Sequence, residues 1–145
     1  MMDLESACSH TRDCINAMEA LYGRPVFDEW AVVAITGSQG RVLHYSGPRS
    51  AEFSEALARD LRHLRQHVGD GRLQPGDFEF SREAEGTGFD AVVAMGGNTY
   101  LLCNHTGSAF SALAEDPLWR KAQVPFVDLT EAFRMEPLET EPATV

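Results

Sequence analysis

Residues 30–45 read Trp30-Ala-Val-Val-Ala-Ile-Thr-Gly-Ser-Gln-Gly-Arg-Val-Leu-His-Tyr45, which is an apolar run, a glycine-bearing turn and a second short run. The first run has the length of a strand and is apolar at consecutive positions, which indicates a strand buried on both faces. Turn residues fill 37–40, and 41–45 returns as a second strand. We therefore predict a β-hairpin whose first strand lies inside a sheet.

A helical pattern lies on each side of this hairpin. The preceding apolar residues recur at helical spacing and are Leu4, Cys8, Ile15, Met18 and Tyr22, with Thr11 in the same series. Gly23 is expected to end that helix. The apolar stripe that follows the hairpin consists of Phe53, Leu57, Leu61, Leu64 and Val68. It predicts a second amphipathic helix, which begins near Ser50.

Three further strands and a third helical segment are expected after the second helix. Phe78 and Phe80 alternate with polar residues, 89–95 is another apolar run, and 100–103 follows a Gly-Gly-Asn turn. Asp116 before Pro117 indicates the start of a helix, and Pro125 is expected to open a separate turn, so we predict a broken third helix. The acidic, proline-containing segment 136–145 is expected to be disordered.

The order of elements is thus helix, two strands, helix, three strands, helix. This order predicts an α+β fold with a five-stranded antiparallel sheet and helices on both faces, formed by a single domain over residues 1–135. Within it, Trp119 and Phe126 are expected to anchor the last helical segment on the body of the domain.

Charge and cysteine content narrow the classes of function. The chain of 145 residues has 22 acidic and 12 basic residues and a formal net charge of −10. Binding to nucleic acid or to anionic membrane is disfavoured, because phosphate contacts require lysine and arginine. The three cysteines, Cys8, Cys14 and Cys103, form no disulfide pattern, and neither a signal peptide nor a membrane-spanning run is visible. We expect a reduced, cytoplasmic protein.

Two residue pairs with metal-binding or catalytic potential each have a simpler interpretation. His63 and His67 share a helix face, but the further ligands that zinc needs are not at recognisable spacing, so a solvated face is favoured. Cys103 and His105 alternate at a strand end without an orienting third group, which favours a buried structural cysteine.

Phosphate-binding and acid–base motifs are no better supported. The glycines lie between strands, where they lack the helix N-terminus that holds a phosphate, and no Gly-x-x-x-x-Gly-Lys-Ser/Thr loop is present. The adjacent acids Asp28-Glu29 and Glu83/Glu85 are interpreted as solvated acidic surface. We therefore expect a protein that is not an enzyme and needs no metal or cofactor.

The stretch 31–46 resembles the first hairpin of the roadblock / dynein light chain family, and 52–68 resembles its long middle helix. Family members usually end in one uninterrupted helix, whereas Pro117 and Pro125 interrupt this one. The resemblance implies a dimer that acts as a platform or regulator of small GTPases, or as a motor-associated subunit. The implied dimer interface, on the middle helix and third strand, is Phe53, Leu57, Leu61, Leu64, Val68, Phe78 and Phe80. The residues expected to be available to a partner are Arg62, His63, Arg65 and His67.

The favoured hypothesis is a non-catalytic dimeric scaffold or regulator that binds a partner protein, most specifically a small GTPase. The first alternative is an acidic chaperone that resembles secretion chaperones, which usually place three strands before the middle helix and two after it. The second is a small-molecule sensor of profilin-like or PAS-like build. That sensor would need a core cavity, and Trp30, Phe78 and Phe89 are expected to fill such a space.

Overall fold

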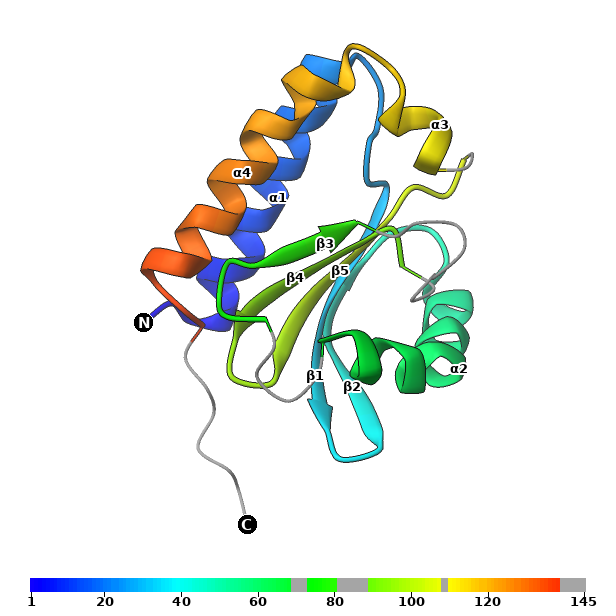
Figure 1. Cartoon of the computed structure of the whole chain (residues 1–145), viewed down its shortest axis with the longest axis vertical. Coiled ribbons are helices and arrows are strands. Elements are labelled where there is room, and N and C mark those ends of the chain that lie inside the picture. Colours follow the sequence, from blue (N-terminus) through cyan, green and yellow to red (C-terminus); the bar gives the residue numbers. More distant parts are fainter. Residues whose placement is uncertain (69–72, 81–88, 108–109, 139–145) are drawn as a thin grey trace.

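The computed structural model describes residues 1–68, 73–80, 89–107 and 110–138. The helices are α1 (Leu4–Tyr22), α2 (Ser50–Val68), α3 (Phe110–Ala114) and α4 (Trp119–Met135). The strands are β1 (Glu29–Thr36), β2 (Gln39–Ser46), β3 (Phe78–Phe80), β4 (Ala91–Gly96) and β5 (Thr99–Asn104). The predicted α+β class and order of elements are confirmed, with α3 as an additional short helix (Figure 1).

The five strands form one antiparallel sheet in the order β2-β1-β5-β4-β3. β1 pairs with β2 on one side and with β5 on the other, which explains why its sequence is apolar on consecutive positions. β2 and β3 are the two edge strands. The sheet therefore has one long edge of eight residues and one short edge of three.

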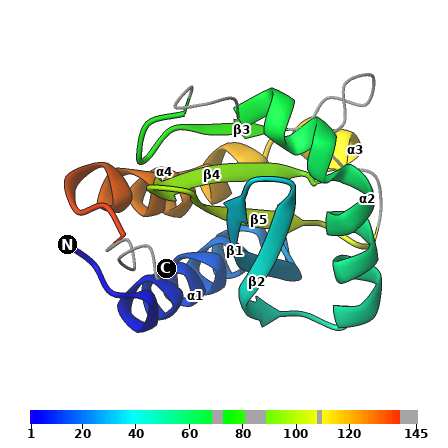
Figure 2. The same cartoon turned by 90° about the horizontal axis from the view of Figure 1, so that it is seen from below.

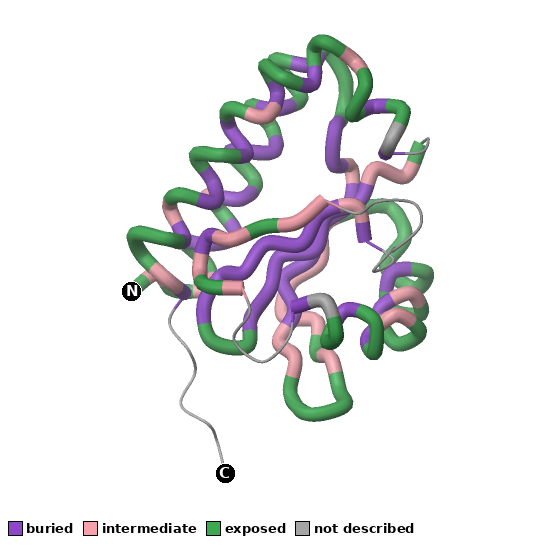
Figure 3. Tube along the Cα trace, in the orientation of Figure 1, coloured by how far each residue is buried: buried purple, intermediate pink, exposed green. Residues whose placement is uncertain are grey.

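Helices cover both faces of the sheet and create two hydrophobic cores. α1 and α4 pack side by side on one face, and α2 lies across the other (Figures 1 and 2). Trp30 and Val32 of β1 face the first layer, whereas Ala31 and Val33 face α2. In Figure 3 the buried positions accordingly follow β4, β5 and the inner sides of the helices.

The bounds of α1 have local causes. The carboxylate of Asp3 accepts a hydrogen bond from the backbone N–H of Ser6 at 2.7 Å and caps the first turn. Gly23 ends the helix with φ at +90°, as the sequence predicts. Thr11, which occupies the apolar series, is buried and donates its hydroxyl to the carbonyl oxygen of Ala7.

The prediction of a broken last helix is wrong. α4 runs without interruption from Trp119 to Met135 with Pro125 inside it, and Asp116 forms the preceding turn. An internal proline removes one helical hydrogen bond, but the buried face of the helix continues through that point. Its members are Trp119, Ala122, Pro125, Phe126, Leu129, Thr130 and Phe133. Packing of this face on the sheet and on α1 outweighs the lost bond.

Trp119 and Phe126 anchor α4, as expected. Both rings are buried, and together with Phe27, Phe80 and Phe110 they form a cluster whose ring centroids lie 5.2–6.3 Å apart. The cluster joins the connector after α1, strand β3 and the two last helices. Edge-to-face and offset pairs of this kind add to the free energy gained by burial alone.

The folded body extends a little beyond residue 135. Leu138 is buried and its backbone N–H donates to the carbonyl oxygen of Met95 at 2.9 Å. Met2 forms an isolated parallel bridge with Leu138, and its N–H donates to the carbonyl oxygen of Pro137 at 3.0 Å. The start of the segment predicted to be disordered is therefore part of the domain, and its remainder, 139–145, lies outside the described residues.

Candidate functional site

The apolar stripe of α2 is buried by the chain itself. Phe53, Leu57, Leu61, Leu64 and Val68 pack against the sheet, and each is at most 8% exposed. These five side chains therefore have intramolecular partners and are largely covered in the single chain. A dimer interface that includes α2 stays a prediction, and it would have to use the sides of the helix that face away from the sheet.

The short edge strand β3 carries the more exposed part of the predicted interface. Phe78 is 36% exposed, and its ring touches only Phe80 and Phe126 among the described aromatic rings, whereas Phe80 packs inward on the aromatic cluster. The expectation that Phe78 fills the interior of the domain is thus wrong, while Trp30 and Phe89 are buried. Beyond β3 the described part of the sheet has no further strand.

The second half of α2 is basic, in contrast to the chain as a whole. Residues 59–67 contain three arginines, two histidines and one acid, Asp60, which pairs with Arg59 at 3.2 Å. Arg62, His63 and Arg65 are exposed, as expected for a partner-binding surface. No hydrogen bond or ion pair with a described residue engages the Arg62 or Arg65 guanidinium. The side chain of His67 lies outside the described residues.

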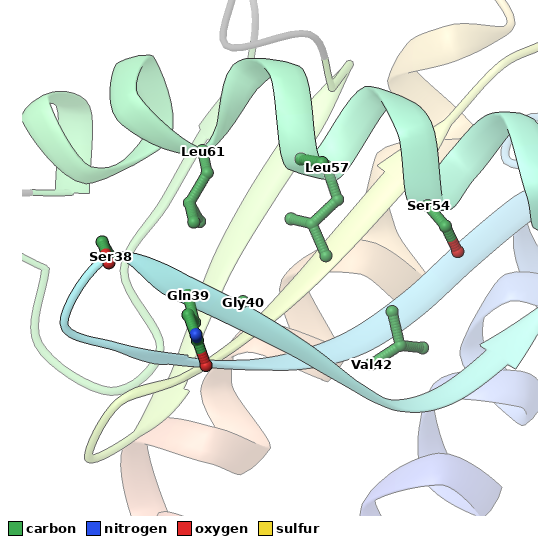
Figure 4. Close-up of a pocket in the computed structure, with 8 residues that line it drawn as sticks. Ser38, Gln39, Gly40, Val42, Ser54, Leu57 and Leu61 are labelled. Carbon is green, nitrogen blue, oxygen red and sulfur yellow. The ribbon is translucent and has the colours of Figure 1, made fainter.

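An open groove of about 390 Å³ separates α2 from the β1–β2 hairpin (Figure 4). Apolar side chains form its floor and small or polar ones its rim. The lining residues are Ser38, Gln39, Gly40, Val42, Ser54, Leu57, Ala58 and Leu61. The groove was not predicted from the sequence. Its signal is the pair of small residues Ser54 and Ala58, four apart beside the apolar stripe, because they leave one flank of the helix uncovered.

Glu29 corrects the interpretation of the adjacent acids as solvated surface. Its side chain is fully buried at the start of β1. One carboxylate oxygen accepts hydrogen bonds from Arg49 Nη2 and Asn104 Nδ2, both at 2.9 Å, and the other accepts from the Tyr45 hydroxyl at 2.7 Å. A buried carboxylate needs such partners, and here they tie the ends of β2 and β5 to the segment that begins α2.

The neighbouring acids are also engaged. Asp28 accepts the backbone N–H of Thr106 at 2.9 Å and the hydroxyl of the same residue. Asp90 accepts the backbone N–H of His105 at 2.6 Å, and burial raises the pKa of the Asp90 carboxyl. The cluster is thus a set of satisfied hydrogen bonds that holds the strand ends together. Glu83 and Glu85 lie outside the described residues.

The cysteines are positioned as core residues. All three are buried with free thiols. Burial raises the pKa of the Cys103 thiol far above its ordinary value and that of Cys14 to about 11, so neither provides a thiolate near neutral pH. His105 Nδ1 donates to the carbonyl oxygen of Val26 at 2.8 Å. The predicted burial of Cys103 is confirmed.

Comparison with known proteins gives no family and no relative: no family model, curated protein or solved structure matches the chain. Within the described ranges, no group of three or more histidine, cysteine, aspartate or glutamate side chains is arranged to hold a metal ion. None of the described helices is long and apolar enough to cross a membrane. The candidate functional surfaces are therefore the two sheet edges, the groove and the basic half of α2.

Proposed function

We propose that the protein is a non-catalytic homodimeric scaffold that docks a partner protein. The observation that carries the proposal is the short edge strand β3 with its partly exposed Phe78. An edge strand presents backbone groups that another strand can satisfy, and a second copy paired through the same edge forms a closed twofold interface. The exposed basic half of α2 supplies a surface for the partner.

Light scattering on the purified chain tests the dimer. We expect twice the chain mass of 16.0 kDa at micromolar concentration. Phe78→Glu should shift the population to monomers, because it places a charge at the centre of the paired edges. Val124→Glu is the matched control, since Val124 is 58% exposed and does not belong to the buried face of α4. A wild-type monomer, or equal effects of both substitutions, would overturn the proposed interface.

A small GTPase is the partner class that the resemblance to the roadblock / dynein light chain family implies. The continuity of α4 through Pro125 removes one of the two proline interruptions noted in the sequence, whereas Pro117 lies between α3 and α4. The protein should recover its partner from a cell extract together with bound guanine nucleotide, detected after denaturation of the eluate. Recovery of partners without nucleotide would leave the scaffold proposal standing and reject the GTPase.

The two alternative functions have less support. Secretion chaperones usually place three strands before the middle helix, whereas two precede α2 here and three follow it. A small-molecule sensor needs an enclosed cavity between sheet and helices. Large side chains fill the described core at Phe53 and Phe89, and the groove described above is open to solvent.

A further inference from the structure

The long edge of the sheet and the groove lie side by side. β2 has no neighbouring strand on its outer side among the described residues, and Gly40 and Val42 of this strand line the groove. An extended peptide laid along β2 would satisfy the outward backbone groups of the edge strand and place alternate side chains toward α2. This edge is opposite β3, so a dimer paired through β3 leaves it accessible.

The groove has room for a large apolar side chain. Leu57 and Leu61 form its floor together with Val42, and Ser38, Gln39 and Ser54 provide polar atoms at its rim (Figure 4). Gly40 lets the two leucines pack closely on β2, because a Cβ there would lie only 3.3 Å from the Leu61 side chain. Apolar floors with a polar rim are typical of peptide-anchoring sites.

The charge beside the groove specifies the occupant. Arg62 lies one helical turn beyond Ala58, and Arg65 lies one turn beyond Leu61, so both continue the flank of α2 that lines the groove. Both arginines are exposed and have no ion-pair partner in the described part of the chain. In a protein of net charge −10, two uncommitted guanidinium groups beside an apolar groove complement acidic side chains.

We propose that the groove between β2 and α2 binds an extended acidic peptide of a partner protein, which adds a strand to β2 and inserts a large apolar side chain over Leu57 and Leu61. This inference rests on the proposed scaffold function and names the chemistry of the segment that is docked. A second copy of the chain is a poorer occupant, because the edge proposed for its self-association is β3, which lies at the opposite margin of the sheet from β2.

The test is a selection of random linear decapeptides displayed on phage against the purified full chain. The wild type should enrich sequences with one large apolar residue among acidic ones. The double variant Arg62→Glu/Arg65→Glu should instead select peptides with basic residues. It should bind the peptides selected on the wild type with an affinity lower by about tenfold or more. Arg120→Glu/Lys121→Glu makes the same change of charge on exposed residues of α4 and should leave the selection unchanged.

A steric variant checks the position of the peptide. Ala58→Trp fills the groove from an exposed helix position and should abolish binding of the selected peptides. Ala20→Trp, at an exposed position of α1 on the other face of the sheet, should not change it. Hydrogen exchange should show added protection at alternate amides of β2 when a selected peptide is bound.

Several outcomes would overturn the proposal. These are a selection without enrichment, an enrichment without acidic preference, peptides insensitive to Ala58→Trp, or peptides that leave the β2 amides unprotected. If the chain binds peptides but is monomeric, the proposed dimer is rejected and the proposed peptide-binding groove is retained. A dimer that binds no peptide would reject only the groove.

Discussion

The carboxylate of Glu29 is the point at which the end of the sheet and the start of α2 are joined. Tyr45, Arg49 and Asn104 donate to it from three separate segments. The Tyr45 hydroxyl has a second role, because it also accepts the backbone N–H of Arg49 at 2.8 Å. Burial, and then the hydrogen bond to Glu29, raises the pKa of Tyr45 to about 12.

This raised pKa predicts a loss of stability in alkali. The phenol stays neutral in the folded protein up to about pH 12, whereas the unfolded chain ionises it near its ordinary pKa of 10.0. The Tyr45 contribution to the free energy of unfolding is therefore complete below pH 10 and declines as the pH rises toward 12. Urea titrations should show a constant difference between wild type and Tyr45→Phe from pH 7 to 9, and a smaller difference above pH 10. A difference that stays constant to pH 12 would contradict the assignment.

The residues around Glu29 also show a limit of sequence reasoning. The sequence around Asp28 and Glu29 gave no sign that Glu29 is buried, because the hydrogen-bond partners of Glu29 are 16, 20 and 75 positions away. Such contacts depend on how β1, β2 and β5 are brought together. Trp119 was easier to place, since a large ring at a helix start that follows a turn is rarely left in solvent.

Trp119→Ala should destabilise the protein by roughly 3–5 kcal/mol, because it leaves a cavity among buried aromatic rings. The ring centroids of Phe80 and Phe110 both lie 5.6 Å from that of Trp119. Val124→Ala on the exposed side of α4 should change stability by less than about 0.5 kcal/mol. Thermal and urea unfolding measure both variants, and an unchanged melting temperature for Trp119→Ala would refute the anchor.

Among the elements, α4 and the segment before β3 depend on each other. Gly76 lies between them: its N–H donates to the carbonyl oxygen of Ala94 at 2.8 Å, and its carbonyl oxygen accepts from Arg134 Nη2. Local sequence signals located every strand and the first two helices. They failed for α4, because the proline signal is local whereas the packing that keeps the helix continuous is not.

Gly76→Ala should be much more harmful than Gly23→Ala, although both glycines have φ at +90°. A Cβ at Gly76 would lie 2.7 Å from Thr130 O and from Arg134 Cβ, whereas one at Gly23 would have no neighbour within 4 Å. We expect a loss of about 1 kcal/mol at Gly23 from the left-handed conformation alone. At Gly76 we expect a loss of roughly 2–4 kcal/mol, because the new Cβ would also have to displace α4. Equal losses in urea unfolding would show that α4 does not constrain this loop.

For the whole molecule, the sequence predicted an antiparallel sheet with helices on both faces, because periodicity reports which side of each element is buried. It did not locate the groove, since a groove depends on the distance between α2 and β2, and the small residues Ser54 and Ala58 alone do not specify that distance. The edges of the sheet could not be predicted either. The sequence indicates the length of each strand, but the strand order, which places β2 and β3 at the two margins, depends on long-range pairing between β1 and β5.

The bridge between Met2 and Leu138 brings the start of the chain and the last described residue to one corner, by the layer of α1 and α4 and across the sheet from α2 (Figure 1). A tether to a solid support at either of these points would therefore leave the molecule in nearly the same orientation. In both cases the groove and the basic half of α2 would face the solution, so an immobilised sample would present its proposed docking surface to every analyte that flows past.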